Sequence, residues 1–192
     1  MSRKEAILEV ALKLFNETST QSSTTNHIAK AMGISPGNLH YHYKNREEII
    51  RLLYIQMRKE TTLSIDELPK SLEVLREHEK VLVKIRWKYR FFYKEMLSLF
   101  ARDSELEELY IKDNIAHRRR IRQVMNNLII NGDLAIDDEE DIDFLVDTIS
   151  LSWQFYDSFL YTIGEELNTV SLQKAINYTA TAMKPYLVRE KK

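Results

Sequence analysis

The segment Ser35–His42, with the sequence Ser-Pro-Gly-Asn-Leu-His-Tyr-His, begins with residues typical of a helix start and continues with several polar and aromatic side chains. Leu39 and Tyr43 lie four residues apart, so on a helix they share one face, which we expect to be buried. The other side chains then point away from the core. They are a glycine, an amide, a phenol and two imidazoles: Gly37, Asn38 and Tyr41, flanked by His40 and His42.

This set of outward groups suits the reading of double-stranded DNA in its major groove. A glycine such as Gly37 permits close approach of the backbone, and the amide of Asn38 can form hydrogen bonds with base edges. The rings can contact thymine methyl groups or phosphates. The simpler alternative is that the rings only cover a corner of the helix.

Neighbouring residues could contact the phosphate backbone of the same DNA. The start of a helix presents free N–H groups and a partial positive charge, both of which favour an anion. For Thr24 alone a purely structural role as a helix cap would be the preferred interpretation, but several candidates fall on one surface. The candidates lie at the starts of three successive helices. They are Thr24, Thr25 and Asn26 before the segment 35–42, Ser35 and Pro36 at its start, and Lys44 and Arg46 at the start of the helix that follows it.

Apolar residues at helical spacing predict the elements that position these groups. We expect a helix over about 3–16, a second over about 24–32 that ends at Gly33, a third with Ser35 as its N-cap, and a fourth over about 45–62. The second and third helices, joined by a turn that contains glycine, form a helix-turn-helix pattern.

The remainder of the chain shows helical spacing and no convincing strand alternation. The sequence therefore predicts an all-α fold with a three-helix helix-turn-helix domain at residues 1–62 and a larger helical domain at residues 63–192. Five helices are expected in the larger domain, at about 71–93, 94–102, 104–131, 140–164 and 171–188.

Composition narrows the possible classes of protein. The 192 residues are 44% hydrophobic and 30% charged, as in an ordinary folded soluble protein, which we expect to be cytoplasmic. No apolar run approaches the roughly 20 residues that a membrane span needs. The chain has no cysteine, which excludes disulfides and thiolate metal sites. Residues 1–60 carry a net charge of +3 and residues 61–192 a net charge of −4, which is compatible with nucleic acid at one end only.

The stretch TTNHIAKAMGISPGNLHYHYKNREEIIRLLY, residues 24–54, resembles the DNA-binding domain of TetR-family transcriptional regulators. The family pattern has a threonine at helix two, an Ile-Ala-x-x-x-Gly-Val/Ile-Ser core and a short Gly-x-Leu-Tyr-x-His/Tyr-Phe recognition helix. This chain departs from it at His40, where tyrosine is usual, at Tyr43, where phenylalanine is usual, and at Arg46, where lysine is common. The resemblance implies DNA contacts at Thr25, Gly37, Tyr41, His42 and Arg46.

The resemblance also implies roles for the larger domain, as a ligand-binding and dimerisation domain. A helix at 140–164 that is apolar nearly all round needs a second cover, and we expect a homodimer through residues 140–188. The alternative is a monomer in which this helix is internal. The expected ligand contacts are an aromatic group that could equally be plain core: Trp87, Phe91, Phe92, Met96, Phe100, Trp153 and Tyr156.

Other patterns carry less weight. The basic run at 117–122 could bind nucleic acid or an acidic ligand, but we favour a solvated helix face whose arginines pair with acids such as Asp113 and Glu107. We expect no metal site, because His40 and His42 diverge on a helix. We also expect no enzymatic activity and no cofactor, because no catalytic arrangement or phosphate-binding loop appears.

The sequence thus predicts a DNA-binding transcriptional regulator. We expect a repressor that a small, largely apolar ligand releases from a pseudo-palindromic operator. The alternative is a constitutive regulator, or one controlled by a protein partner, without a small-molecule inducer. The operator, the effector, the regulated genes and the sign of regulation do not follow from the sequence.

Overall fold

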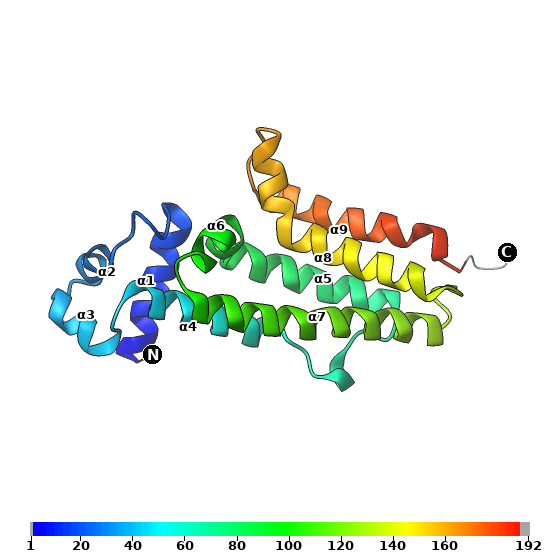
Figure 1. Ribbon diagram of the computed structural model, residues 1–192, viewed down its shortest axis with the longest axis horizontal. Helices are drawn as coiled ribbons and strands as arrows, with labels where there is room; N and C mark the ends of the chain where they lie inside the picture. Colours follow the sequence, from blue (N-terminus) through cyan, green and yellow to red (C-terminus); the bar gives the residue numbers. More distant parts are fainter. Residues whose placement is uncertain (1, 189–192) are drawn as a thin grey trace. The chain divides into compact units, whose positions relative to one another are not determined.

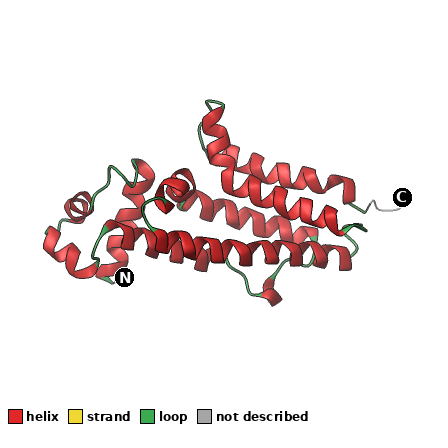
Figure 2. Cartoon of the chain, viewed as in Figure 1, coloured by secondary structure: helices red, strands yellow, loops and turns green. Residues whose placement is uncertain are grey.

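The structure is a computed structural model that describes residues 2–188. Within that range it contains helices and no strand, as Figure 2 shows, so the predicted all-α class is confirmed. None of the described helices is long and apolar enough to cross a membrane. The elements, labelled in Figure 1, are α1 (Arg3–Glu17), α2 (Thr25–Met32), α3 (Pro36–His42), α4 (Arg46–Thr61), η1 (Ile65–Glu67), α5 (Leu72–Lys88), α6 (Arg90–Phe100), α7 (Ser104–Ile130), α8 (Glu139–Thr162), α9 (Thr169–Met183) and η2 (Lys184–Tyr186).

The chain forms two compact units. The first consists of the chain up to Thr62 together with Lys88–Glu107, and the second of Leu63–Trp87 together with the chain from Glu108 onward. The expected boundary after residue 62 coincides with one of the joints between units. However, α6 belongs to the same compact unit as α1–α4, whereas the sequence analysis predicted that α6 belongs to the larger domain. The functional division into 1–62 and 63–192 stays a prediction.

Polar contacts bind α6 and the start of α7 to the N-terminal helices of the first unit. The N–H and hydroxyl groups of Thr20, which is fully buried, donate to the carboxylate of Glu95 on α6 at 3.0 and 2.5 Å. Arg51 on α4 donates to Asp103 just before α7 at 2.7 Å. These contacts join residues more than fifty positions apart, which explains why the sequence did not indicate them.

The end predicted for the helix over 71–93 is wrong. Helix α5 ends at Lys88, because the chain leaves the helical conformation at Tyr89 (φ −109°, ψ 29°). The side chain of Asn16 on α1 stabilises this break from both sides. Its Nδ2 donates to the carbonyl of Lys88 at 2.8 Å, and its Oδ1 accepts from the N–H of Phe91 at 3.1 Å. The partner that satisfies both helix ends therefore comes from a distant segment.

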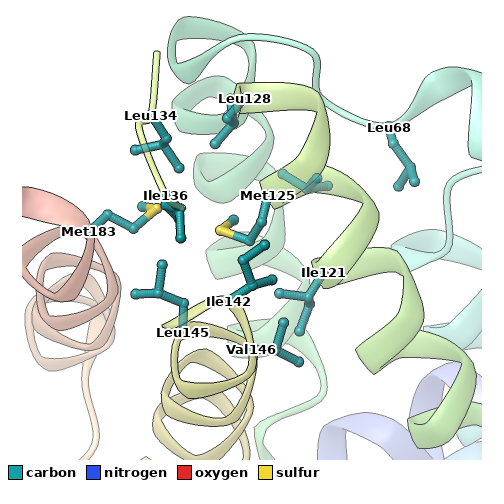
Figure 3. Close-up of a cluster of buried hydrophobic side chains, with 11 residues drawn as sticks. Leu68, Ile121, Met125, Leu128, Leu134, Ile136, Ile142, Leu145, Val146 and Met183 are labelled. Carbon is teal, nitrogen blue, oxygen red and sulfur yellow. The ribbon is translucent and has the colours of Figure 1, made fainter. Parts of the chain in front are cut away.

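The second unit is built around an apolar cluster supplied mainly by α7 and α8. Figure 3 shows these side chains meeting Met183 of α9 and residues of the loop before α8. Helices α8 and α9 run side by side (Figure 1), and their packing completes this core. The buried members are Leu68, Ile121, Val124, Met125, Leu128, Leu134, Ile136, Ile142, Leu145, Val146 and Met183.

Candidate nucleic-acid interface

The helix-turn-helix begins with a reciprocal cap on α2. The hydroxyl of Thr24 accepts from the N–H of His27 at 3.4 Å, and Nδ1 of His27 accepts from the N–H of Thr24 at 3.2 Å. At the other end Gly33 takes a left-handed conformation (φ 65°), and the N–H of Ile34 donates to the carbonyl of Ala29 at 3.0 Å. The turn between α2 and α3 is thereby fixed by local chemistry.

Helix α3 is oriented by its cap and by two inward side chains. The hydroxyl of Ser35 accepts from the N–H of Asn38 at 3.2 Å, and Pro36 occupies the first turn. Leu39 is fully buried, and Tyr43 is buried with its hydroxyl donating to a carbonyl of α1 at 3.0 Å. The predicted inward face of this helix is confirmed.

The opposite face of α3 is open to solvent. Tyr41 is 86% exposed, and its ring meets the edge of the His42 ring at a centroid distance of 5.2 Å. Asn38 is exposed, and no hydrogen bond holds its side-chain amide within the described part of the chain. His40 is exposed too, with Nδ1 3.2 Å from the carbonyl oxygen of Lys44. Within residues 2–188 there is no group of three His, Cys, Asp or Glu side chains that could hold a metal ion.

Gly37 has no structural need to be glycine. Its φ is not positive, and a Cβ atom built there would meet no atom of the chain within 4 Å. Alanine would fit the helix better on backbone entropy alone. The fold of the described chain thus does not require glycine here, and close approach of a partner to this backbone stays a prediction.

Arg46 is the predicted DNA contact that the geometry supports least. Its guanidinium donates to the carbonyl of Thr20 at 2.8 Å and to the carboxylate of Glu47 at 2.9 Å, and only 20% of its side chain is exposed. These contacts stabilise the loop before α2. A phosphate would have to compete with them, so the geometry does not favour the phosphate contact expected for Arg46, which stays a prediction.

The other phosphate candidates keep accessible groups. Asn26 and Lys44 are exposed, and Thr25 is half-buried at the first turn of α2. The N–H of Lys44 is held by Glu48 at 2.6 Å, which leaves its ammonium group to extend from the end of α3. Thr24 differs from these, because its hydroxyl already caps α2.

Two family models match the chain. The model described as bacterial regulatory proteins of the tetR family matches residues 7–53, and the TetR model described as bacterial transcriptional repressor matches residues 46–192. The second match alone covers more than half of the chain. The chain belongs to the TetR family. The resemblance inferred from residues 24–54 is thereby confirmed.

Known TetR-family proteins agree with this assignment. A TetR-family transcriptional regulator from Marinobacter aquaeolei has a solved structure with a TM-score of 0.89 and 27% identity, over 99% of this chain and 93% of its own. YerO of Bacillus subtilis, an uncharacterised HTH-type transcriptional regulator, is 25% identical over 77% of this chain but only 63% of its own length. IcaR of Staphylococcus epidermidis, the negative regulator of the biofilm operon icaADBC, is 40% identical over 25% of this chain and 26% of its own.

Outside the helix-turn-helix, this TetR-family chain exposes apolar side chains along α8 and α9. Those on α8 recur at helical spacing on one face and are not members of the buried cluster. Such a row on two adjacent helices is the surface that the sequence assigned to a homodimer. Its members are Phe144, Leu151, Phe155 and Phe159 on α8, and Val170 and Tyr178 on α9.

The expected ligand contacts do not form one group. Phe91, Phe92, Met96 and Phe100 belong to the first unit, whereas Trp87, Trp153 and Tyr156 belong to the second. Phe91 and Phe92 are 2% and 1% exposed, and their rings pack against Phe15 of α1 and Tyr54 of α4 at centroid distances of 5.4 and 5.0 Å. Their packing makes them core residues of the helix-turn-helix unit, as the simpler interpretation of the sequence allowed.

The basic run on α7 pairs with a different helix from the one expected. Arg118 contacts Asp147, and Arg122 contacts Glu139 at 2.6 Å, so both partners lie on α8 rather than on α7. The arginines border an open hollow of about 240 Å³ between the two helices. At such exposure these ion pairs contribute little to stability. Arg118 and Arg119 lie on a solvated face, whereas Nη1 of Arg120 is buried and has no hydrogen bond within the described residues.

Sequence reasoning missed a buried ion pair in the second unit. Arg86 on α5 donates to the carboxylate of Asp157 on α8 at 2.6 Å, and the two side chains are 1% and 4% exposed. Arg86 also donates to the carbonyl of Trp153 and lies 5.0 Å from the centroid of its ring. The available signal was an arginine and an aspartate at core-facing positions of apolar helical stripes.

Proposed function

We propose that this TetR-family chain is a repressor that binds a pseudo-palindromic operator as a homodimer and is released from it by a small, largely apolar ligand. Residues 1–62 would form the DNA-binding domain and residues 63–192 the ligand-binding and dimerisation domain. The observation that carries the proposal is the open face of α3, where Gly37 has free space around it and the side chains of Asn38 and Tyr41 are exposed.

In this proposal α3 enters the major groove. Asn38 contacts base edges, and Tyr41 and the neighbouring imidazoles contact thymine methyl groups or phosphates. The first turn of α2, at Thr25 and Asn26, and the ammonium group of Lys44 hold the phosphates on either side. Repression is supported by the description of the matching family model and by the negative regulator IcaR, which aligns over a stretch of 48 residues.

The dimer would form through residues 140–188. Twofold symmetry would place the exposed apolar rows of α8 and α9 of one protomer against the same rows of its partner. Two DNA-binding domains related by this twofold axis would recognise half-sites about 34–36 Å apart, or at a related spacing. The operator is therefore expected to have the same twofold symmetry.

Ligand control would act through the second unit. Trp87, Trp153 and Tyr156 are the aromatic contacts that we retain for the effector. Binding would shift α4 and change the separation of the two DNA-binding domains. A coupling free energy of about 1–3 kcal/mol would lower operator affinity ~5- to 150-fold. The packing of Phe91 and Phe92 into the first unit favours, as the second candidate, a regulator controlled by a protein partner or by none.

The test is selection of bound sequences from random duplex DNA, followed by a screen for small molecules that release the selected duplex. We expect Tyr41→Ala to weaken binding at least about tenfold and to leave the dimer intact. Lys44→Ala should lower the salt dependence of binding by about one ion, whereas Lys13→Ala, which removes an exposed cation from α1, should not. Failure to select any duplex would refute the proposal.

A further inference from the structure

The helix-turn-helix carries three histidines, and their hydrogen bonds differ. His40 and His42 stand one residue before and after Tyr41, so their side chains project about 100° to either side of it around α3. His27 lies in the first turn of α2. A neutral imidazole has one N–H that donates and one bare nitrogen that accepts. The partner of each ring nitrogen therefore decides what the ring can offer to DNA.

The neutral form of His40 carries its proton on Nδ1. That atom lies 3.2 Å from the carbonyl oxygen of Lys44, and because a carbonyl oxygen only accepts, Nδ1 donates. The other ring nitrogen, Nε2, then has a lone pair and no hydrogen bond within residues 2–188, although the side chain is exposed. A lone pair repels the anionic oxygens of a phosphate. The neutral ring of His40 is therefore a poor phosphate contact.

The neutral form of His27 is the opposite one. Its Nδ1 accepts from the N–H of Thr24 at 3.2 Å, so the proton lies on Nε2 and can donate to an anion. A second proton on Nδ1 would set donor against donor and break the cap of α2, where the helix dipole also opposes a positive charge. Helix α2 packs against α3 and has Lys30 as its charged side chain. Protonation of His27 would thus remove a cap instead of adding a contact.

His42 is constrained by neither kind of bond. Its ring meets the ring of Tyr41 at a centroid distance of 5.2 Å, and its nitrogens make no hydrogen bond within the described residues. Both neutral forms are open to it. His42 can therefore turn an N–H toward a phosphate without gaining a proton, which sets it apart from His40.

The charged groups beside His40 are of both signs. The carboxylate of Glu48 accepts from the N–H of Lys44, the residue whose carbonyl His40 contacts, at 2.6 Å. Lys44 adds its own ammonium group, and from α1 Lys4 and Glu5 lie beside the C-cap of α3. The acids favour a second proton on the imidazole, and the lysines oppose it. A phosphate within hydrogen-bond distance would add a negative charge and so favour the protonated ring.

We propose that His40 is a phosphate contact that forms only when its ring is protonated, so that acidic pH tightens binding of the operator. This inference rests on the proposed DNA-binding function. The second proton enters at Nε2, while Nδ1 keeps its hydrogen bond to the carbonyl of Lys44, and the resulting cation donates to a phosphate oxygen. Because the contact needs that proton, it is complete at low pH and is lost as pH rises through about 5–8, the range in which imidazoles titrate.

Operator affinity measured against pH tests the proposal. In fluorescence anisotropy, the full chain should bind the selected duplex at least about tenfold more tightly at about pH 5.5 than at about pH 8, and the salt dependence should steepen by about one ion per protomer. His40→Gln, whose amide does not titrate, should lose most of both differences, whereas His42→Gln should keep them. An unchanged affinity ratio in His40→Gln would overturn the proposal. Urea unfolding at both pH values separates a loss of binding from a loss of fold.

A variant with a permanent charge tests the same point in the other direction. His40→Lys should show, at about pH 8, the salt dependence that the wild type shows only at about pH 5.5. If its salt dependence at about pH 8 equals that of the wild type, a cation at position 40 does not reach a phosphate, and the proposal is refuted.

The two neutral forms are tested without DNA. Nitrogen-15 spectra of the histidine-labelled full chain near about pH 8 distinguish a protonated ring nitrogen from a bare one, and the signals absent from His40→Gln and His27→Gln assign them. The proton should lie on Nδ1 in His40 and on Nε2 in His27; a proton on Nε2 of His40 would refute the proposal. Failure to select any duplex would refute the proposed function as well, whereas a duplex bound equally well at both pH values would overturn this proposal alone.

Discussion

Replacing Gly37 by alanine should move stability and DNA affinity in opposite directions. Glycine inside a helix is less favourable than alanine by up to about 1 kcal/mol, and since position 37 lies in the first turn of a short helix we expect a gain of roughly 0.5 kcal/mol. The new methyl group meets no atom of the chain within 4 Å. If the backbone of α3 lies against DNA, the same methyl group occupies that contact and should weaken binding at least about tenfold, or 1.4 kcal/mol.

Gly33→Ala is the matched control, because it makes the same substitution four residues away in a different backbone conformation. Gly33 has φ +65° and also has open space around a built Cβ atom, so alanine there costs only the left-handed conformation, about 1–2 kcal/mol. Urea unfolding followed by circular dichroism measures stability, and fluorescence anisotropy at fixed salt measures binding to the selected duplex. A destabilised Gly37→Ala variant would reveal a structural role that the geometry does not account for, and undiminished affinity would refute close approach of α3 to DNA.

Three further predictions concern the second unit and its surface. Arg86→Met or Asp157→Leu alone should lower the free energy of unfolding by about 3–5 kcal/mol, because each leaves a buried charge, whereas the double variant should recover most of the loss; additive losses in urea titrations would contradict this. Phe155→Asp should raise the dimer dissociation constant about a hundredfold by placing a charge in the apolar face, while Leu97→Asp, at an exposed apolar residue of α6, should not change sedimentation. Glu79 has its pKa raised by burial to about 7, so the stability it contributes is full below its ordinary pKa and is lost as pH rises through about 7; relative to Glu79→Gln, the wild type should lose on the order of 1 kcal/mol between mildly acidic and mildly alkaline pH.

The helix-turn-helix could be predicted from the sequence because the residues that specify it lie close together in the chain. Gly33 at the turn, Ser35 as a cap, and Leu39 with Tyr43 on one face specify α3 within eleven residues, and the structure places each as expected. The direction of the outward groups follows from the same helical period. Their contacts with DNA stay predictions, because no partner is present in the chain itself.

Other expectations depended on segments that meet only in the folded chain. The pairing of Arg46 with Thr20 and Glu47 could not be anticipated from a basic residue near a helix start, because one of its partners lies in the loop before α2. The aromatic run at 87–100 is divided between the two units directly after Trp87, and the break at Tyr89 depends on Asn16 of α1. Aromatic side chains at helical spacing look alike in sequence whether they pack on a neighbouring helix or line a cavity.

The sequence by itself determined the all-α class, the helix-turn-helix and the outward face of α3, because caps, glycine turns and helical periodicity act over a few residues. Only the tertiary structure decided that α6 packs with α1–α4, that the arginines of α7 pair with α8, and that Arg86 meets Asp157 inside the second unit. Such pairings depend on which helix faces which, and the free energy that selects them comes from burial shared by distant segments rather than from any one stretch of chain.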